Sequence, residues 1–153
     1  MEKWWLEIFI KIFERMKQTK AYFTEKFTKE MEDYAKEKLT NNEYKIFLLM
    51  GRYDKIHCVK CAMEVEKNID KFKKSRWITA ALLHDCGKPK NKGYISRSVN
   101  AIFHNIKGLY NHAETGYIIL KDINIDAAEI IKRHHDENLE GLYKLFQEID
   151  NKS

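Results

Sequence analysis

The sequence predicts an all-α fold, in which one compact domain is built as a helical bundle. The 153 residues contain only one proline and six glycines, so strong breakers of regular structure are scarce. Apolar residues recur at intervals of three and four, as they do along one face of an amphipathic helix. No stretch of alternating apolar and polar residues is convincing as a strand. A chain of this length is typical of a single domain.

The first part of the chain predicts two amphipathic helices and the start of a third. Residues 1–20, "MEKWWLEIFIKIFERMKQTK", carry apolar residues at helical spacing, and the following segment does the same. "TNNE", with Thr40 and Glu43, fits a capping box that opens a helix through "YKIFLLM". The two stripes consist of Trp5, Phe9, Ile12, Phe13 and Met16, and of Phe23, Phe27, Met31, Tyr34 and Ala35.

The middle and the end of the chain predict further helices. Ser75 is expected to cap "RWITAALLHD", which is apolar on most faces and therefore central in the core, and which Gly87 and Pro89 end. Residues 88–111 form the least regular segment. "HAETGYIILKDI" is helical again. "DAAE", with Asp126 and Glu129, predicts a second capping box that opens "IIKRHH", and "LEGLYKLFQEID" forms the last helix.

Composition and charge limit the class of protein. No run of about 18 apolar residues is present, and the N-terminal segment lacks the cleavage site of a secretory signal. Three cysteines, an odd number, favour a reducing cytoplasm over a disulfide framework. Residues 46–100 carry 12 basic and 5 acidic residues, a net charge of +7, whereas the whole chain is +5. This local positive charge suits an anionic ligand such as a phosphate ester.

Four of the six histidines are predicted to lie at helix ends, where side chains from different helices can meet. His57 is expected to begin a helix, and His84 with Asp85 ends one. His112 begins a helix and His134 ends another. Imidazole nitrogens and carboxylate oxygens are the donors that hold divalent ions such as Mn, Fe, Co, Ni and Zn. A carboxylate also has two oxygens, so Asp85 can bridge two ions.

These blocks, in this order, resemble the HD superfamily of metal-dependent phosphohydrolases. The resemblance rests on His57, "ALLHDCGK", "HAETGYIIL", "EIIKRHHD" and "LYKLFQEIDNKS". It covers residues 46–153, the expected HD-type metal-binding domain, and leaves residues 1–45 as an N-terminal helical extension that packs on this core. His104 matches no block.

The resemblance implies a ligand set and a mechanism. His57, His84, Asp85 and Asp150 would form the basic metal site, and His112 and His134 match the two further histidines of members that hold two ions. The register after "IIKR" favours His134 over His135 as the ligand, which leaves His135 to line the substrate pocket. Asp54 and Asp136 are possible substitutes for Asp150.

A water activated by one or two divalent ions (Fe, Mn, Ni, Co, Zn or Mg) would attack phosphorus. Asp85 takes the bridging or water-orienting role, and Lys88 contacts a phosphate as a catalytic and substrate-binding group. Arg52 is the next substrate contact, and Lys55, Lys90, Lys92 and Arg97 are further candidates. A small nucleotide-like phosphate ester or anhydride is the expected substrate. Cyclic di-GMP is disfavoured, because "HHDENLEGL" stands where a glycine-tyrosine-proline signature would be.

Other interpretations remain open from the sequence. A non-catalytic metal or nucleotide sensor, or a partner-binding module, would keep the same ligands. Cys58 and Cys61 have CxxC spacing, but a thiolate zinc site needs a second pair, which is missing. The N-terminal segment could lie at a membrane interface or dimerise, although packing on the core is favoured. The basic excess is too modest to predict a specific nucleic-acid partner, and the oligomeric state is open.

Overall fold

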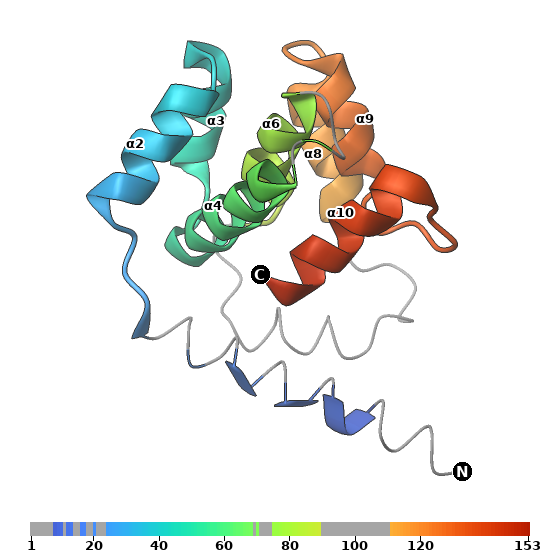
Figure 1. Cartoon of the computed structure of the whole chain (residues 1–153). Helices are drawn as coiled ribbons and strands as arrows, with labels where there is room; N and C mark the ends of the chain where they lie inside the picture. Colours follow the sequence, from blue (N-terminus) through green and yellow to red (C-terminus); the bar gives the residue numbers. More distant parts are fainter. Residues whose placement is uncertain are drawn as a thin grey trace. The chain divides into compact units, whose positions relative to one another are not determined.

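The computed structural model describes residues 8–10, 12–13, 16–17, 20, 24–68, 70, 75–89 and 111–153. Helices and turns make up these residues, with no β-strand among them, so the predicted all-α fold is confirmed (Figure 1). Contacts divide the chain into two compact units, residues 1–26 with 92–107 and residues 27–91 with 108–153. Within the described ranges, no helix is both long enough and apolar enough to cross a lipid bilayer.

In the first unit, the described residues 8–10, 12–13, 16–17, 20 and 24 are helical, in agreement with the apolar stripe of the N-terminal segment. Several residues singled out in the sequence lie outside the described ranges, so their predicted roles stay predictions. They are Trp5, Phe23, Lys90, Lys92, Arg97 and His104.

The second unit is a helical bundle built around one central helix. Its elements are α2 (Lys29–Lys38), α3 (Asn41–Leu49), α4 (Arg52–Lys67), α6 (Arg76–Leu83), α8 (His112–Leu120), α9 (Ile125–Arg133) and α10 (Gly141–Lys152). Every residue of α6 from Trp77 to Leu83 is buried, and this helix packs on α2, α3, α4 and α9. The near absence of polar residues in "RWITAALL" explains this position, because a helix that is apolar on all sides is stable only where every side is covered.

The predicted capping box at α3 is confirmed. The Thr40 hydroxyl accepts a hydrogen bond from the Glu43 backbone N–H, and the Glu43 carboxylate accepts one from the Thr40 N–H at 2.8 Å. Both groups belong to adjacent turns of one helix, so the sequence alone is enough to specify this cap.

Two other predicted caps are wrong. Ser75 precedes α6, but its backbone is already helical and its side chain makes no capping hydrogen bond. Helix α9 begins at Ile125, before "DAAE", and its cap is Asn124, which accepts from the Ala127 N–H at 3.0 Å. The amide of Asn124 also donates to Glu43 Oε1 at 2.7 Å, so this cap is held by a partner on α3 as well as by its own helix.

Candidate metal centre

The residues predicted as metal ligands come together from five parts of the second unit. His57 lies on α4 and His112 opens α8. His84 and Asp85 form the turn that follows α6, His134 is the residue after α9, and Asp150 lies on α10. The expectation that His57 begins a helix is wrong, because α4 already starts at Arg52, after Gly51. His57 therefore lies within the second turn, on a rigid part of the helix.

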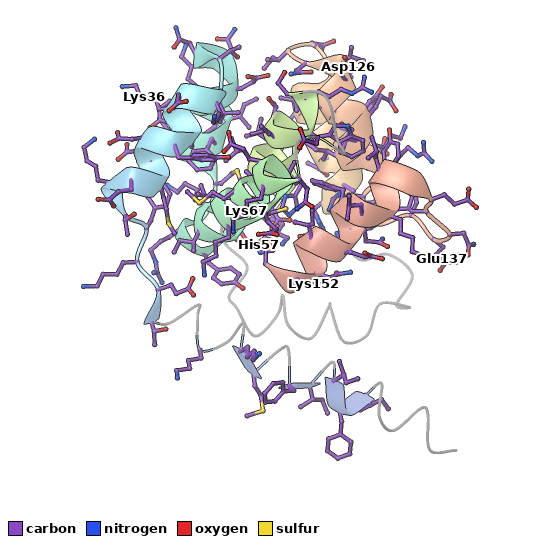
Figure 2. The ribbon with its side chains drawn as sticks, viewed as in Figure 1. Lys36, His57, Lys67, Asp126, Glu137 and Lys152 are labelled. Atoms are coloured by element: carbon purple, nitrogen blue, oxygen red, sulfur yellow. The ribbon has the colours of Figure 1, made fainter. Side chains whose placement is uncertain are left out.

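One group, the aspartate trio, consists of His57, His84 and Asp150. Asp150 Oδ1 lies 2.8 Å from His57 Nε2 and 3.0 Å from His84 Nε2, and the two nitrogens are 3.3 Å apart. The Nδ1 of His84 donates to the Ala81 carbonyl oxygen at 2.8 Å, which turns Nε2 toward the trio. Figure 2 labels His57 on α4, on the side of that helix near α10. The three side chains could hold a metal ion.

A second group, the histidine trio, consists of His112, His134 and His135. The Nε2 atoms of His112 and His135 are 3.0 Å apart, and the rings of His134 and His135 have centroids 3.8 Å apart. His134 Nδ1 bonds to the Ile131 carbonyl oxygen. Its Nε2 is buried and has no hydrogen-bond partner among the described residues. A buried lone pair without a partner is costly unless something binds it, so this atom fits a metal ligand.

Asp85 lies between the two trios. Its Oδ1 is 3.7 Å from His84 Nε2 and 3.5 Å from His112 Nε2, while its Oδ2 is 2.5 Å from the Lys88 ammonium. The Asp85 side chain is 2% exposed, so water cannot replace these partners easily. A single carboxylate therefore faces one histidine from each trio, which is the arrangement of a bridging group.

Glycines place the turn that carries His84 and Asp85 directly against α8. A Cβ atom on Gly87 would lie 2.1 Å from the His112 carbonyl oxygen and 2.6 Å from the Gly116 backbone nitrogen. Gly87 does not have a positive φ, so it is required for close backbone approach rather than for a left-handed turn. This contact holds the turn that carries His84 and Asp85 against the start of α8, where His112 lies. The sequence interpretation of Gly87 as a helix stop missed this function.

Burial and neighbouring charges shift the pKa values of the two trios in different directions. Burial opposes ionisation of Asp150, but His84 and His57 hold the pKa of its carboxyl well below its usual value. Burial alone would lower the pKa of His84, yet the carboxylates of Asp150 and Asp85 raise it well above its usual value. Burial lowers the pKa of His112 to about 3 and of His134 to about 4, so both are neutral at pH 7.

The remaining predicted residues have varied surroundings. Lys88 pairs with Asp85, and Arg52 is exposed at the start of α4. His135, predicted to line the pocket, joins His112 and His134 in one trio. Of the substitutes for Asp150, Asp54 is buried and Asp136 is exposed, 3.6 Å from Arg133.

The cysteines are close to the centre but poorly suited to bind metal as thiolates. Cys58 Sγ lies 3.6 Å from His84 Nδ1, and Cys58, His84 and Asp85 form a third group that could hold an ion. Burial raises the pKa of the Cys58 and Cys61 thiols, so both are protonated at neutral pH. The aspartate trio and the histidine trio are therefore the better candidates, and their nitrogen and oxygen donors fit a borderline to hard divalent ion.

Comparisons with known proteins agree with this geometry. The model of one protein family, described as HD domain, matches residues 55–149. That span contains His57, the turn with His84 and Asp85, and the whole histidine trio, and it ends one residue before Asp150. No curated protein and no solved structure matches the chain.

Proposed function

This chain belongs to the HD-domain family, and we propose that it is a metal-dependent phosphohydrolase that cleaves a phosphate ester or anhydride of a nucleotide-like substrate. The observation that carries the proposal is the position of Asp85 Oδ1 between His84 Nε2 and His112 Nε2. A carboxylate that faces two groups of nitrogen donors suits a centre that holds two ions on one substrate.

The ligands divide into two sets that share Asp85. The aspartate trio with Asp85 would hold one divalent ion, and the histidine trio with Asp85 would hold the second. The donor types admit Fe, Mn, Ni, Co, Zn or Mg. The Nε2 of His134 has no hydrogen-bond partner within the described part of the chain, which supports its assignment as a ligand. The short distance between His135 and His112 extends the assignment to His135.

Bound divalent ions supply a water of lowered pKa and positive charge near the phosphoryl oxygens. Asp85 is the carboxylate that faces both trios, so we assign it the role of orienting the attacking water. The exposed side chain of Arg52 would contact a phosphate group of the substrate. The net charge of +7 within residues 46–100 would attract that anion toward the centre.

A small phosphorylated compound is the proposed substrate, and nucleotides and dinucleoside polyphosphates are the compounds to screen first. The proposal includes a cytoplasmic location and no specific nucleic-acid partner. Cyclic di-GMP is the least favoured candidate, because the segment after His135 lacks the glycine-tyrosine-proline signature.

The test combines metal analysis with turnover. The purified protein is reconstituted with Mn²⁺, Fe²⁺, Co²⁺, Ni²⁺ or Mg²⁺, bound metal is counted, and phosphate release is measured on nucleotides and dinucleoside polyphosphates. Asp85→Asn keeps the shape of the side chain but removes its charge, and Asp85→Ala removes the donor altogether. Asp122→Asn, an exposed aspartate in the turn between α8 and α9, is the matched control.

We expect the wild type and Asp122→Asn to release phosphate. Both Asp85 variants should lose this activity and should also bind at least one metal ion fewer. A protein that binds no metal and releases no phosphate under any of these conditions would contradict the proposal. A protein that binds metal and nucleotide without turnover would instead support the alternative of a non-catalytic sensor.

A further inference from the structure

Lys88 makes the closest contact to Asp85 in the centre. Its ammonium lies 2.5 Å from Asp85 Oδ2, and its side chain is 29% exposed against 2% for Asp85. The sequence predicts that Lys88 contacts a phosphate of the substrate, but in the structure its ammonium is paired with Asp85. The pair therefore raises the question of what the lysine does for the carboxylate.

The two oxygens of Asp85 have separate partners. Oδ2 contacts Lys88, whereas Oδ1 faces His84 Nε2 at 3.7 Å and His112 Nε2 at 3.5 Å. A carboxylate can rotate about its last side-chain bond, so a fixed partner on one oxygen also fixes the direction of the other. Charge-assisted hydrogen bonds of this kind are short and directional.

We infer that Lys88 is a positioning residue that acts through Asp85: it holds Oδ2 so that Oδ1 stays directed between the two trios. This inference rests on the proposed function, in which Asp85 is the carboxylate shared by the two metal positions. Partners that orient metal ligands in this way are typically worth about 10- to 100-fold in metal affinity or activity.

The inference and the phosphate-contact role predict different kinetics. If Lys88 binds the substrate phosphate, its loss raises KM and leaves the binding of metal alone unchanged. If Lys88 holds Asp85, its loss weakens metal binding in the absence of substrate and lowers kcat, because Asp85 Oδ2 is left buried without its partner. Metal binding without substrate therefore separates the two roles.

The experiment measures Mn²⁺ binding to the full chain by calorimetry and the electron paramagnetic resonance spectrum of the loaded protein. Lys88→Met keeps the length of the side chain and removes its charge, whereas Lys88→Arg restores a cation. Lys144→Met, an exposed lysine on α10, is the matched control. Thermal unfolding of each variant reports whether it is folded, and Lys88→Gln is the second variant if Lys88→Met does not fold.

We expect Lys88→Met to bind Mn²⁺ about 10- to 100-fold more weakly and to lose the spectral coupling between two bridged ions, with KM changed by less than about threefold. Lys88→Arg should recover most of the affinity, Lys88→Gln should weaken Mn²⁺ binding as Lys88→Met does, and Lys144→Met should match the wild type.

Unchanged Mn²⁺ affinity and spectrum in a folded Lys88→Met, or in Lys88→Gln where Lys88→Met does not fold, would overturn the inference and leave the proposed function intact. A raised KM with normal metal binding would restore the phosphate-contact role. A wild-type protein that binds no Mn²⁺ would overturn both the inference and the metal centre on which it rests.

Discussion

The aspartate trio takes its side chains from α4, α10 and the turn after α6, whereas the histidine trio takes its side chains from the start of α8 and the end of α9. The first contains the ionised carboxylate of Asp150 and a histidine whose pKa is raised. In the second, His112 and His134 are neutral at pH 7. Two groups of similar size thus differ in charge and in protonation.

The difference bears on how each trio would bind an ion. With Asp85 included, the aspartate trio offers two carboxylates and two imidazoles, and the histidine trio offers three imidazoles and one carboxylate. The additional anion favours a hard cation at the first position, whereas imidazole-rich sets suit borderline metals. We therefore expect the aspartate trio to hold its ion more tightly.

Removal of one ligand from each trio gives the largest expected effect and tests this order directly. Both His57→Ala and His112→Ala should lower turnover by at least about 100-fold, since loss of a ligand costs more than loss of a partner that orients it. In a Mn²⁺ titration, His112→Ala should keep the tighter site and lose the weaker one, and His57→Ala should do the reverse. Identical titration curves for the two variants would show that the trios are not independent.

A substitution at Gly87 can disturb the packing between the turn with His84 and Asp85 and the start of α8 without replacing a ligand side chain. Gly87→Ala brings a Cβ atom against backbone atoms of α8, which cannot move aside as a side chain can. We expect the free energy of unfolding to fall by about 2–3 kcal/mol, measured by urea denaturation.

Gly51→Ala is the control for this clash, because its added Cβ meets only the side-chain carboxylate of Asp54. A loss of stability at Gly51 as large as that at Gly87 would argue against the close backbone approach as the cause.

The number of protons released on metal binding tests whether the two trios differ in protonation. The raised pKa of His84 means that it holds a proton at neutral pH, and an ion must displace that proton to bind Nε2. Affinity at the aspartate trio should therefore rise with pH, by up to about tenfold per pH unit below the pKa of His84.

His112 and His134, with pKa values of about 3 and about 4, release no proton near pH 7, so affinity at the histidine trio should stay nearly constant there. Calorimetry of His57→Ala and His112→Ala in buffers of different protonation enthalpy measures the proton count for each trio. Equal proton release from both trios would contradict the predicted difference.

The smallest expected effect comes from the cap of α9, the helix that ends at His134 of the histidine trio. Asn124→Ala removes the hydrogen bond to the Ala127 N–H and the bond to Glu43, and should cost about 1 kcal/mol of stability. Mn²⁺ binding at the histidine trio should weaken slightly, with no change at the aspartate trio. Thr28→Ala removes the cap of α2 and serves as the control, with a similar loss of stability and unchanged metal binding.

Local signals in the sequence were sufficient for several features whose partners lie within one helix, although the predicted caps at Ser75 and Asp126 were wrong. The Thr40–Glu43 box was predicted correctly, as were His112 at the start of α8 and His134 at the end of α9. Signals that depend on distant partners were not available. Asn124 caps α9 and is itself held by Glu43 on α3. A glycine is needed at position 87 because the backbone of α8 lies so close, and not because of the helix that precedes it.

The position of His57 and the partner of Lys88 escaped prediction for related reasons. "RYDK" reads as a turn, but Gly51 precedes it and already provides the extended residue that starts α4. Lys88 follows a helix stop and reads as a free basic residue, because no pattern shows that Asp85 turns one oxygen back toward it. Residue type and order therefore predict which groups meet, whereas the assignment of each oxygen requires the folded structure.

The oxygen of Asp150 that faces two histidines also bears on the order of folding. His57 and Asp150 are separated by 93 residues, so the contact between them closes a long loop. The chain loses conformational entropy on closing this loop before the contact can stabilise the fold. Helices α8 and α9 are neighbours in the chain and can pair early. The aspartate trio is then the last part of the centre to be completed, and metal capture by a refolding chain would report the docking of α10.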